Sequence, residues 1–180
     1  MGSEMCIRDR LNNNKEIDGF IVQLPLPKHI DEQKILLSIN PNKDVDGFHP
    51  TNFGKMALNM ETFIPATPYG IMELLKRYKI ETKGKHTVVI GRSHIVGRPI
   101  SILMNSKGAV GDSTVTVTHS RTTDIESYIK KADIVVSALG IPGFVKKNMD
   151  FKFQNETDRI IEIKDIPPKS KVKRFMIGWN

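Results

Sequence analysis

The strongest constraint on the fold is a regular alternation of strand and helix patterns between positions 86 and 138. Three short runs rich in β-branched residues, bounded by turn residues, are separated by two segments with helical periodicity. Such alternation is typical of right-handed βαβ units, which build a parallel sheet. Strands are expected at 86–91, 114–118 and 133–138, and helices at 97–104 and 124–131.

The turn after the first of these strands has features of a phosphate-binding turn. Gly91 ends the strand and Gly97 opens the helix, but Ser93 stands where a G-x-G-x-x-G fingerprint has its second glycine. A helix N-terminus at such a turn offers free N–H groups to a phosphate. This turn alone is compatible with two interpretations: a dinucleotide site, or a glycine turn in an α/β domain that binds no nucleotide.

The end of the second strand favours NADP over NAD. A protein that selects NAD usually carries an acidic residue there, which holds the ribose 2′-hydroxyl. Here the chain reads Thr-His-Ser-Arg-Thr at 118–122, without an acid. A 2′-phosphate is attracted by hydroxyl and cationic groups, and Arg92 on the first turn could reach the same place.

The segment before position 66 contains a candidate buried strand at 20–22, followed by Gln23 and a proline-rich exit. A short helix is expected at 31–40. A second helix is expected to begin with Thr67 as N-cap and Pro68 in its first position.

Composition restricts the classes of function. The net charge of +7 permits phosphate ligands, but 143–180 holds nine Lys/Arg against five Asp/Glu, so much of the excess lies in the tail. Nucleic-acid binding through that tail remains an alternative. A single cysteine excludes an internal disulfide. We expect no metal site and no membrane segment, and a cytoplasmic location.

Several stretches together resemble the bifunctional methylenetetrahydrofolate dehydrogenase/methenyltetrahydrofolate cyclohydrolase family. Their order and spacing match that family over roughly 11–149, and this combination is far more specific than any one stretch. The stretches are 18–27, 41–50, 63–70, 91–99, 116–122 and 132–143.

The resemblance implies an α/β fold with two parts, incomplete at both ends: a partial folate-binding α/β domain, then a Rossmann-like NADP-binding domain with a parallel sheet. It implies oxidation of 5,10-methylenetetrahydrofolate to the 5,10-methenyl form with NADP, then hydrolysis to 10-formyltetrahydrofolate in a cleft between the domains. It also implies a homodimer for the full-length family. The alternative is a non-catalytic nucleotide-binding module.

The same resemblance assigns roles in the folate-binding part. Gln23 matches a glutamine that hydrogen-bonds and tunes a catalytic lysine, and Asp46 matches a carboxylate that binds the pterin ring. Leu24 and Pro25 are assigned to the substrate site. Without the resemblance, Gln23 would satisfy backbone groups beside Pro25, and Asp46 would be an ordinary turn former.

In the nucleotide-binding part, the resemblance assigns cofactor contacts to Gly91, Arg92, Ser93 and Ser120. Without it, Ser93 would be no more than a helix cap.

The chain also departs from the family. The catalytic lysine belongs to a Tyr-x-x-x-Lys motif that these 180 residues do not contain. General acid–base groups contribute about 10²–10⁴-fold, so we expect an inactive or impaired fragment. We expect 1–10 to be a non-native start, 11–65 a remnant of the folate-binding domain, 66–149 the NADP-binding domain and 150–180 a divergent tail.

Overall fold

The structure is a computed structural model that describes residues 2–141, 144 and 145. The divergent tail expected at 150–180 lies outside the described residues. The chain divides into two compact units between Gly70 and Ile71, and each unit is described by itself.

The second unit contains a parallel sheet of three strands in the order β2-β1-β3, which confirms the expected α/β fold. The central strand pairs with both neighbours, Val88 lying opposite Thr116 on one side and Val135 on the other. Each element agrees with its expected range to within about a residue. The bounds are β1 His86–Ile90, α5 Gly97–Asn105, β2 Thr114–Thr118, α6 Ile125–Lys130 and β3 Ile134–Ser137.

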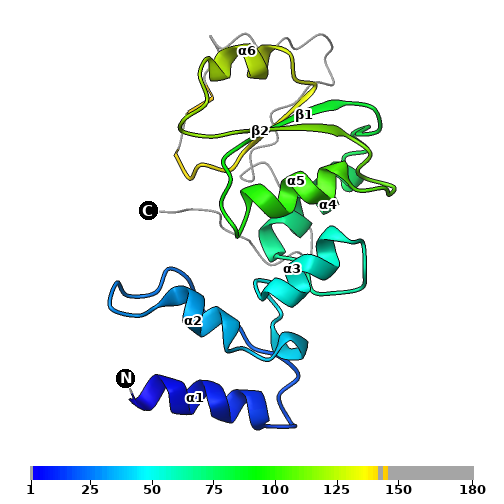
Figure 1. The fold of residues 1–180 in the computed structure, drawn as a ribbon. Helices are drawn as coiled ribbons and strands as arrows, with labels where there is room; N and C mark the ends of the chain where they lie inside the picture. The colour runs from blue at the N-terminus through cyan, green and yellow to red at the C-terminus, as the bar shows by residue number, and fades with distance from the viewer. Residues whose placement is uncertain (1, 142–143, 146–180) are drawn as a thin grey trace. The chain divides into compact units, whose positions relative to one another are not determined.

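Helices cover both faces of this sheet, with α5 on one face and α6 on the other (Figure 1). Successive side chains of a strand point to opposite faces, so β1 supplies both cores. Val89 packs with Ile100 of α5 and with Leu75 of α4 (Ala66–Arg77). Val88 packs with Ile129 of α6. Burial on both faces explains why Val88, Val89 and Ile90 of β1 form a continuous apolar run, whereas β2 alternates threonine with valine and is only partly buried.

The first unit is built from short helices joined by long loops. Two hydrogen bonds join the end of the first helix to the segment that follows the second: Asn12 Nδ2 donates to the Ser38 carbonyl at 2.8 Å, and Lys43 Nζ donates to the Leu11 carbonyl at 2.8 Å. The elements are α1 Gly2–Asn13, α2 Glu32–Leu37, the 3₁₀ helix η1 Pro41–Lys43 and α3 Pro50–Ala57.

The expected strand at 20–22 is wrong. Phe20 forms only an isolated parallel bridge with Asp44, and Ile21 is 56% exposed. The apolar run has no neighbouring strand among the described residues, so nothing extends the pairing beyond one bridge.

The expected start of the second helix is also wrong by a small margin. α4 begins at Ala66, because the Pro65 carbonyl accepts a hydrogen bond from Tyr69 N at 3.0 Å. Thr67 therefore lies inside the first turn, and so does Pro68, which is tolerated there because that N–H needs no helical partner. The helices α1 and α3 were not expected from the sequence.

Candidate functional site

The β1–α5 turn of the second unit brings two glycines together at the carboxyl end of β1. Gly91 has φ +117°, and a Cβ there would lie 2.7 Å from the Ala138 carbonyl oxygen beyond β3. A Cβ at Gly97 would lie 2.6 Å from the carbonyl carbon of Gly91 and 2.8 Å from Arg92 N. Only glycine fits at either position, so these residues shape the turn through backbone contact.

Ser93 lies in this turn, three residues before Val96, which is the N-cap residue of α5. Its Oγ accepts hydrogen bonds from Val96 N and Gly97 N, each at 3.2 Å, and its carbonyl accepts from Arg98 N at 2.9 Å. Ser93 therefore satisfies N–H groups at the start of α5 without being its N-cap residue. The hydroxyl proton is not used in those bonds, so Ser93 can still donate to an anion at the positive end of α5. Arg92 beside it is exposed.

The chain leaves the end of β2 in a tight turn. Gly91 N donates to the Thr118 carbonyl at 2.8 Å, which joins this strand end to the β1–α5 turn. Within the turn, Thr122 N donates to the His119 carbonyl at 2.8 Å, and His119 N donates to Thr122 Oγ1 at 2.9 Å. Ser120 is exposed in this turn. The four predicted cofactor residues therefore lie at the carboxyl ends of two adjacent strands, where α/β sheets bind ligands.

In the first unit, Gln23 is exposed and its Nε2 donates to the Leu24 carbonyl at 2.9 Å. Leu24 is buried, and a cis peptide bond joins it to Pro25, which is exposed. Gln23 therefore satisfies a backbone carbonyl beside Pro25, as expected for it without the family resemblance. The amide oxygen of Gln23 accepts no hydrogen bond from any described residue, so it is available to a donor.

Asp46 lies in the loop between η1 and α3, which is organised by its neighbour Asp44. The Asp44 carboxylate is 2% exposed, and its Oδ2 accepts from His49 N at 2.8 Å and Asn52 Nδ2 at 2.9 Å. Thr62 Oγ1 in turn donates to Asn52 Oδ1 at 3.1 Å. This chain of bonds holds the loop against α3 and the segment that follows α3.

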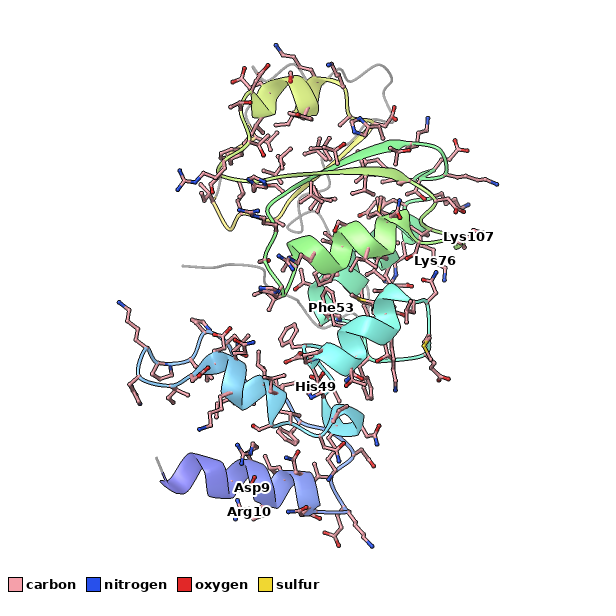
Figure 2. The ribbon with its side chains drawn as sticks, viewed as in Figure 1. Asp9, Arg10, His49, Phe53, Lys76 and Lys107 are labelled. Atoms are coloured by element: carbon pink, nitrogen blue, oxygen red, sulfur yellow. The ribbon has the colours of Figure 1, made fainter. Side chains whose placement is uncertain are left out.

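His49 belongs to the same loop, where its Nδ1 accepts from Thr51 N at 3.2 Å and caps α3. Figure 2 shows it at the start of α3, with Phe53 further along the helix.

The carboxyl group of Asp46 is half-buried and makes no hydrogen bond with any described residue. Burial raises its pKa above the ordinary value, and the nearby charge of Asp44 raises the pKa further. Such a carboxylate has unsatisfied acceptor capacity, which suits a ligand that presents N–H donors.

Sequence reasoning missed Asp44, Asn52 and Thr62. The only signal in the sequence was the repeated acid in Lys43-Asp-Val-Asp-Gly47, which does not reveal which carboxylate is buried. The distinction depends on Asn52, which lies eight residues beyond Asp44.

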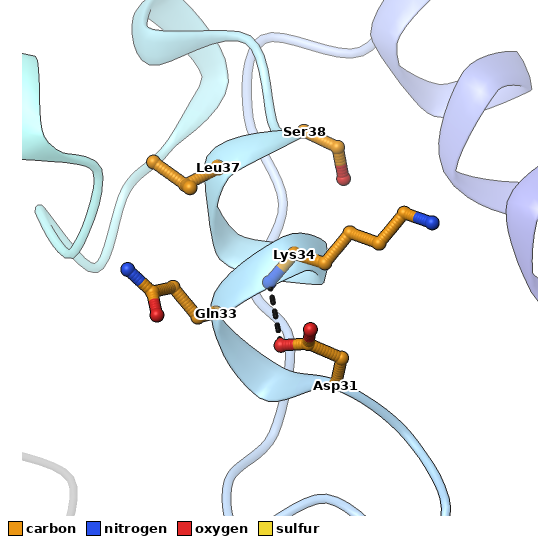
Figure 3. A pocket seen from close by; sticks show the side chains of 5 residues that line it. All are labelled: Asp31, Gln33, Lys34, Leu37 and Ser38. Carbon is orange, nitrogen blue, oxygen red and sulfur yellow. Dashed lines mark hydrogen bonds between the residues drawn. The ribbon is translucent and has the colours of Figure 1, made fainter.

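One further surface feature holds none of the predicted site residues. A surface depression on α2 is lined by Asp31, Gln33, Lys34, Leu37 and Ser38, and Asp31 there caps the helix by accepting from Lys34 N at 3.0 Å (Figure 3). Within 2–141, 144 and 145, no three acidic, histidine or cysteine side chains gather where they could hold a metal ion. In the same residues, no helix has the length and apolar character needed to cross a membrane.

Two family models match the chain. The model described as "Tetrahydrofolate dehydrogenase/cyclohydrolase, NAD(P)-binding domain" matches residues 65–155, and the model described as "Tetrahydrofolate dehydrogenase/cyclohydrolase, catalytic domain" matches residues 6–46. The first match covers the β1–α5 turn and the end of β2. The second covers Gln23 and ends at Asp46.

Individual proteins give the same result. The bifunctional protein FolD of Flavobacterium johnsoniae is 73% identical over 139 residues, which are 77% of this chain and 47% of that protein. The FolD structure from Campylobacter jejuni is 43% identical with a TM-score of 0.75, over 81% of this chain and 50% of that one. The Trypanosoma brucei enzyme, solved with NADP cofactor and an inhibitor, is 40% identical with a TM-score of 0.73, over 80% and 48%. The chain thus spans about half the length of the relatives it matches.

Proposed function

The chain belongs to the tetrahydrofolate dehydrogenase/cyclohydrolase family, and from that membership we propose that it carries the NADP site and part of the folate site of a bifunctional enzyme. The enzyme oxidises 5,10-methylenetetrahydrofolate to the 5,10-methenyl form with NADP and hydrolyses this to 10-formyltetrahydrofolate. In this proposal, 11–65 belong to the folate-binding domain and 66–149 to the NADP-binding domain, and the family models extend these bounds to residue 6 at one end and to residue 155 at the other.

The residues at the carboxyl ends of β1 and β2 fit a phosphate-bearing cofactor. Arg92 and Ser120 are exposed, and Ser93 can donate its hydroxyl proton beside the N-terminus of α5. Cationic, hydroxyl and helix-terminal donors are the groups that bind phosphate. The family model names this domain NAD(P)-binding, and the Trypanosoma brucei relative was solved with NADP, which supports NADP for this chain. When bound, the cofactor supplies the hydride acceptor.

The folate part of the proposal rests on the loop between η1 and α3. Asp46 is assigned to bind the N–H groups of the pterin ring, and its partly buried, unpaired carboxylate supports that role. Gln23 is assigned to bind a lysine ammonium. Its amide oxygen, which accepts no hydrogen bond from a described residue, could accept one from that ammonium. Leu24 and Pro25 are assigned to the wall of the substrate site.

We further propose, from the family resemblance, that the longer protein is a cytoplasmic homodimer that binds neither nucleic acid nor membranes. The observation that carries the whole proposal is the glycine-shaped β1–α5 turn, joined to an acid-free turn at the end of β2.

Calorimetric titration of the 180-residue chain with NADP⁺ and NAD⁺ tests this proposal. Arg92→Ala should weaken NADP⁺ binding roughly tenfold, because hydrogen bonds to charged groups contribute about 1.5–3 kcal/mol. Affinity for NAD⁺ should change much less. Lys107→Ala is the control, since Lys107 is an exposed cation just past the other end of α5 (Figure 2). A chain that binds neither cofactor at millimolar concentration would contradict the proposed function.

A further inference from the structure

We propose that His119 is a specificity-determining residue that donates a hydrogen bond to the 2′-phosphate of NADP, an inference that rests on the proposed function. His119 directly follows β2. At this position an NAD-selecting protein carries an acidic residue that hydrogen-bonds the ribose 2′-hydroxyl. The family resemblance assigned the neighbouring Ser120 to the cofactor and left His119 without a role.

The turn after β2 fixes the position of the His119 ring. The backbone of His119 is bound on both sides, to Thr122 N and to Thr122 Oγ1. The ring is bound as well, because its Nδ1 accepts a hydrogen bond from Arg121 N at 3.2 Å. The side chain is half-buried, so packing restricts it in addition.

This contact also determines where the ring carries its proton. A backbone N–H can only donate, so Nδ1 must accept and the neutral ring is protonated at Nε2. Nε2 has no hydrogen-bond partner among the described residues. The His119 ring is therefore fixed through Nδ1, and its Nε2–H is available to donate to a ligand.

The surroundings of this donor suit an anion. Ser120 and Arg121 are exposed in the same turn, and no acidic residue occurs between 113 and 123. The nearest acid along the chain, Asp124, caps α6 by accepting from Ser127 N at 3.2 Å. A phosphate needs donors, whereas the 2′-hydroxyl of NAD gains most from a carboxylate acceptor. A fixed Nε2–H at this position therefore discriminates in favour of NADP.

Two substitutions distinguish the role of Nδ1 as an acceptor from the role of Nε2 as a donor. His119→Asn keeps an acceptor at the position of Nδ1, because an Asn side chain accepts from the N–H two residues on, but it removes the distal donor. His119→Gln keeps a donor near the position of Nε2 and removes the proximal acceptor. His29→Asn is the matched control, since His29 is an exposed histidine of the first unit.

The experiment is calorimetric titration of each 180-residue variant with NADP⁺ and NAD⁺, with thermal unfolding recorded on the same samples. His119→Asn should weaken NADP⁺ binding about tenfold or more and change NAD⁺ binding less than about twofold. His119→Gln should stay within about threefold of wild type for NADP⁺, and His29→Asn should change neither affinity.

The possible outcomes distinguish failure of the His119 role from failure of the proposed function. If the wild-type chain binds neither cofactor, the proposed function fails and the role of His119 fails with it. If the wild type binds NADP⁺ and His119→Asn leaves the ratio of the two affinities unchanged, only the role of His119 is overturned. Equal loss of both cofactors, or a Gln variant as weak as the Asn variant, overturns it as well.

Discussion

The β1–α5 turn of the second unit and the loop between η1 and α3 of the first are built in opposite ways. The turn depends on backbone: two glycines approach neighbouring carbonyl groups so closely that no side chain fits. The loop depends on side chains: the buried Asp44 carboxylate and Asn52 hold it in place. The turn should therefore fail when an atom is added, and the loop when a polar atom is removed.

The largest effect is expected from adding a methyl group to the turn. Gly97→Ala should destabilise the second unit by about 2–3 kcal/mol, because the new Cβ collides with backbone atoms of Gly91 and Arg92 that cannot move independently. Urea unfolding measures the change. Gly54→Ala in α3 is the control: no atom lies within 4 Å of its added Cβ, so it should stabilise by about 0.5–1 kcal/mol. Similar destabilisation by both substitutions would contradict the steric requirement for glycine at position 97.

The loop should respond to loss of its acceptor. Asp44→Ala should destabilise the first unit by about 2 kcal/mol, because His49 N and one hydrogen of the Asn52 amide lose a buried partner. Asp44→Asn should cost less than about 1 kcal/mol, since a single amide oxygen can accept both bonds. Urea unfolding and the amide resonances of His49 and Asn52 report the difference. Equal losses in the two variants would mean that the charge, not the acceptor, holds the loop.

The smallest effect is expected at Asp46, where function and stability oppose each other. Burial and the Asp44 charge raise its pKa above 3.8, so the folded state disfavours the ionised form. The resulting loss of stability develops as the pH rises from 3.8 through the folded pKa, and it is complete above that pKa. Asp46→Asn should therefore raise the urea midpoint at pH 7 but not below pH 3.8.

The same Asp46→Asn variant should bind tetrahydrofolate more weakly, because an amide nitrogen cannot accept the pterin N–H bonds. Asp18→Asn, at an exposed position in the same unit, controls for loss of negative charge. A gain in stability that persisted at pH 3.5 would show that ionisation of Asp46 is not its cause.

The two regions also differ in how far the sequence predicted them. The alternation over 86–138 located all three strands and both helices of that stretch to within about a residue, because apolar periodicity and turn glycines are local signals. The strand expected at 20–22 was wrong, because Phe20 finds a single bridge partner in Asp44 and the run has no strand beside it. The roles assigned to the eight site residues stay predictions.

The parallel βαβ architecture and the family follow from the sequence alone, because short-range patterns specify the first and several motifs in register specify the second. Which of the two neighbouring carboxylates is buried depends on side-chain contacts in the folded state, because the Asp44 carboxylate is held by Asn52, eight residues further along, and Asn52 in turn by Thr62. The tertiary structure also decided that the His119 ring is held by Arg121 N with Nε2 left free. Each of these outcomes depends on the direction of a side chain in three dimensions, which residue type and spacing do not specify.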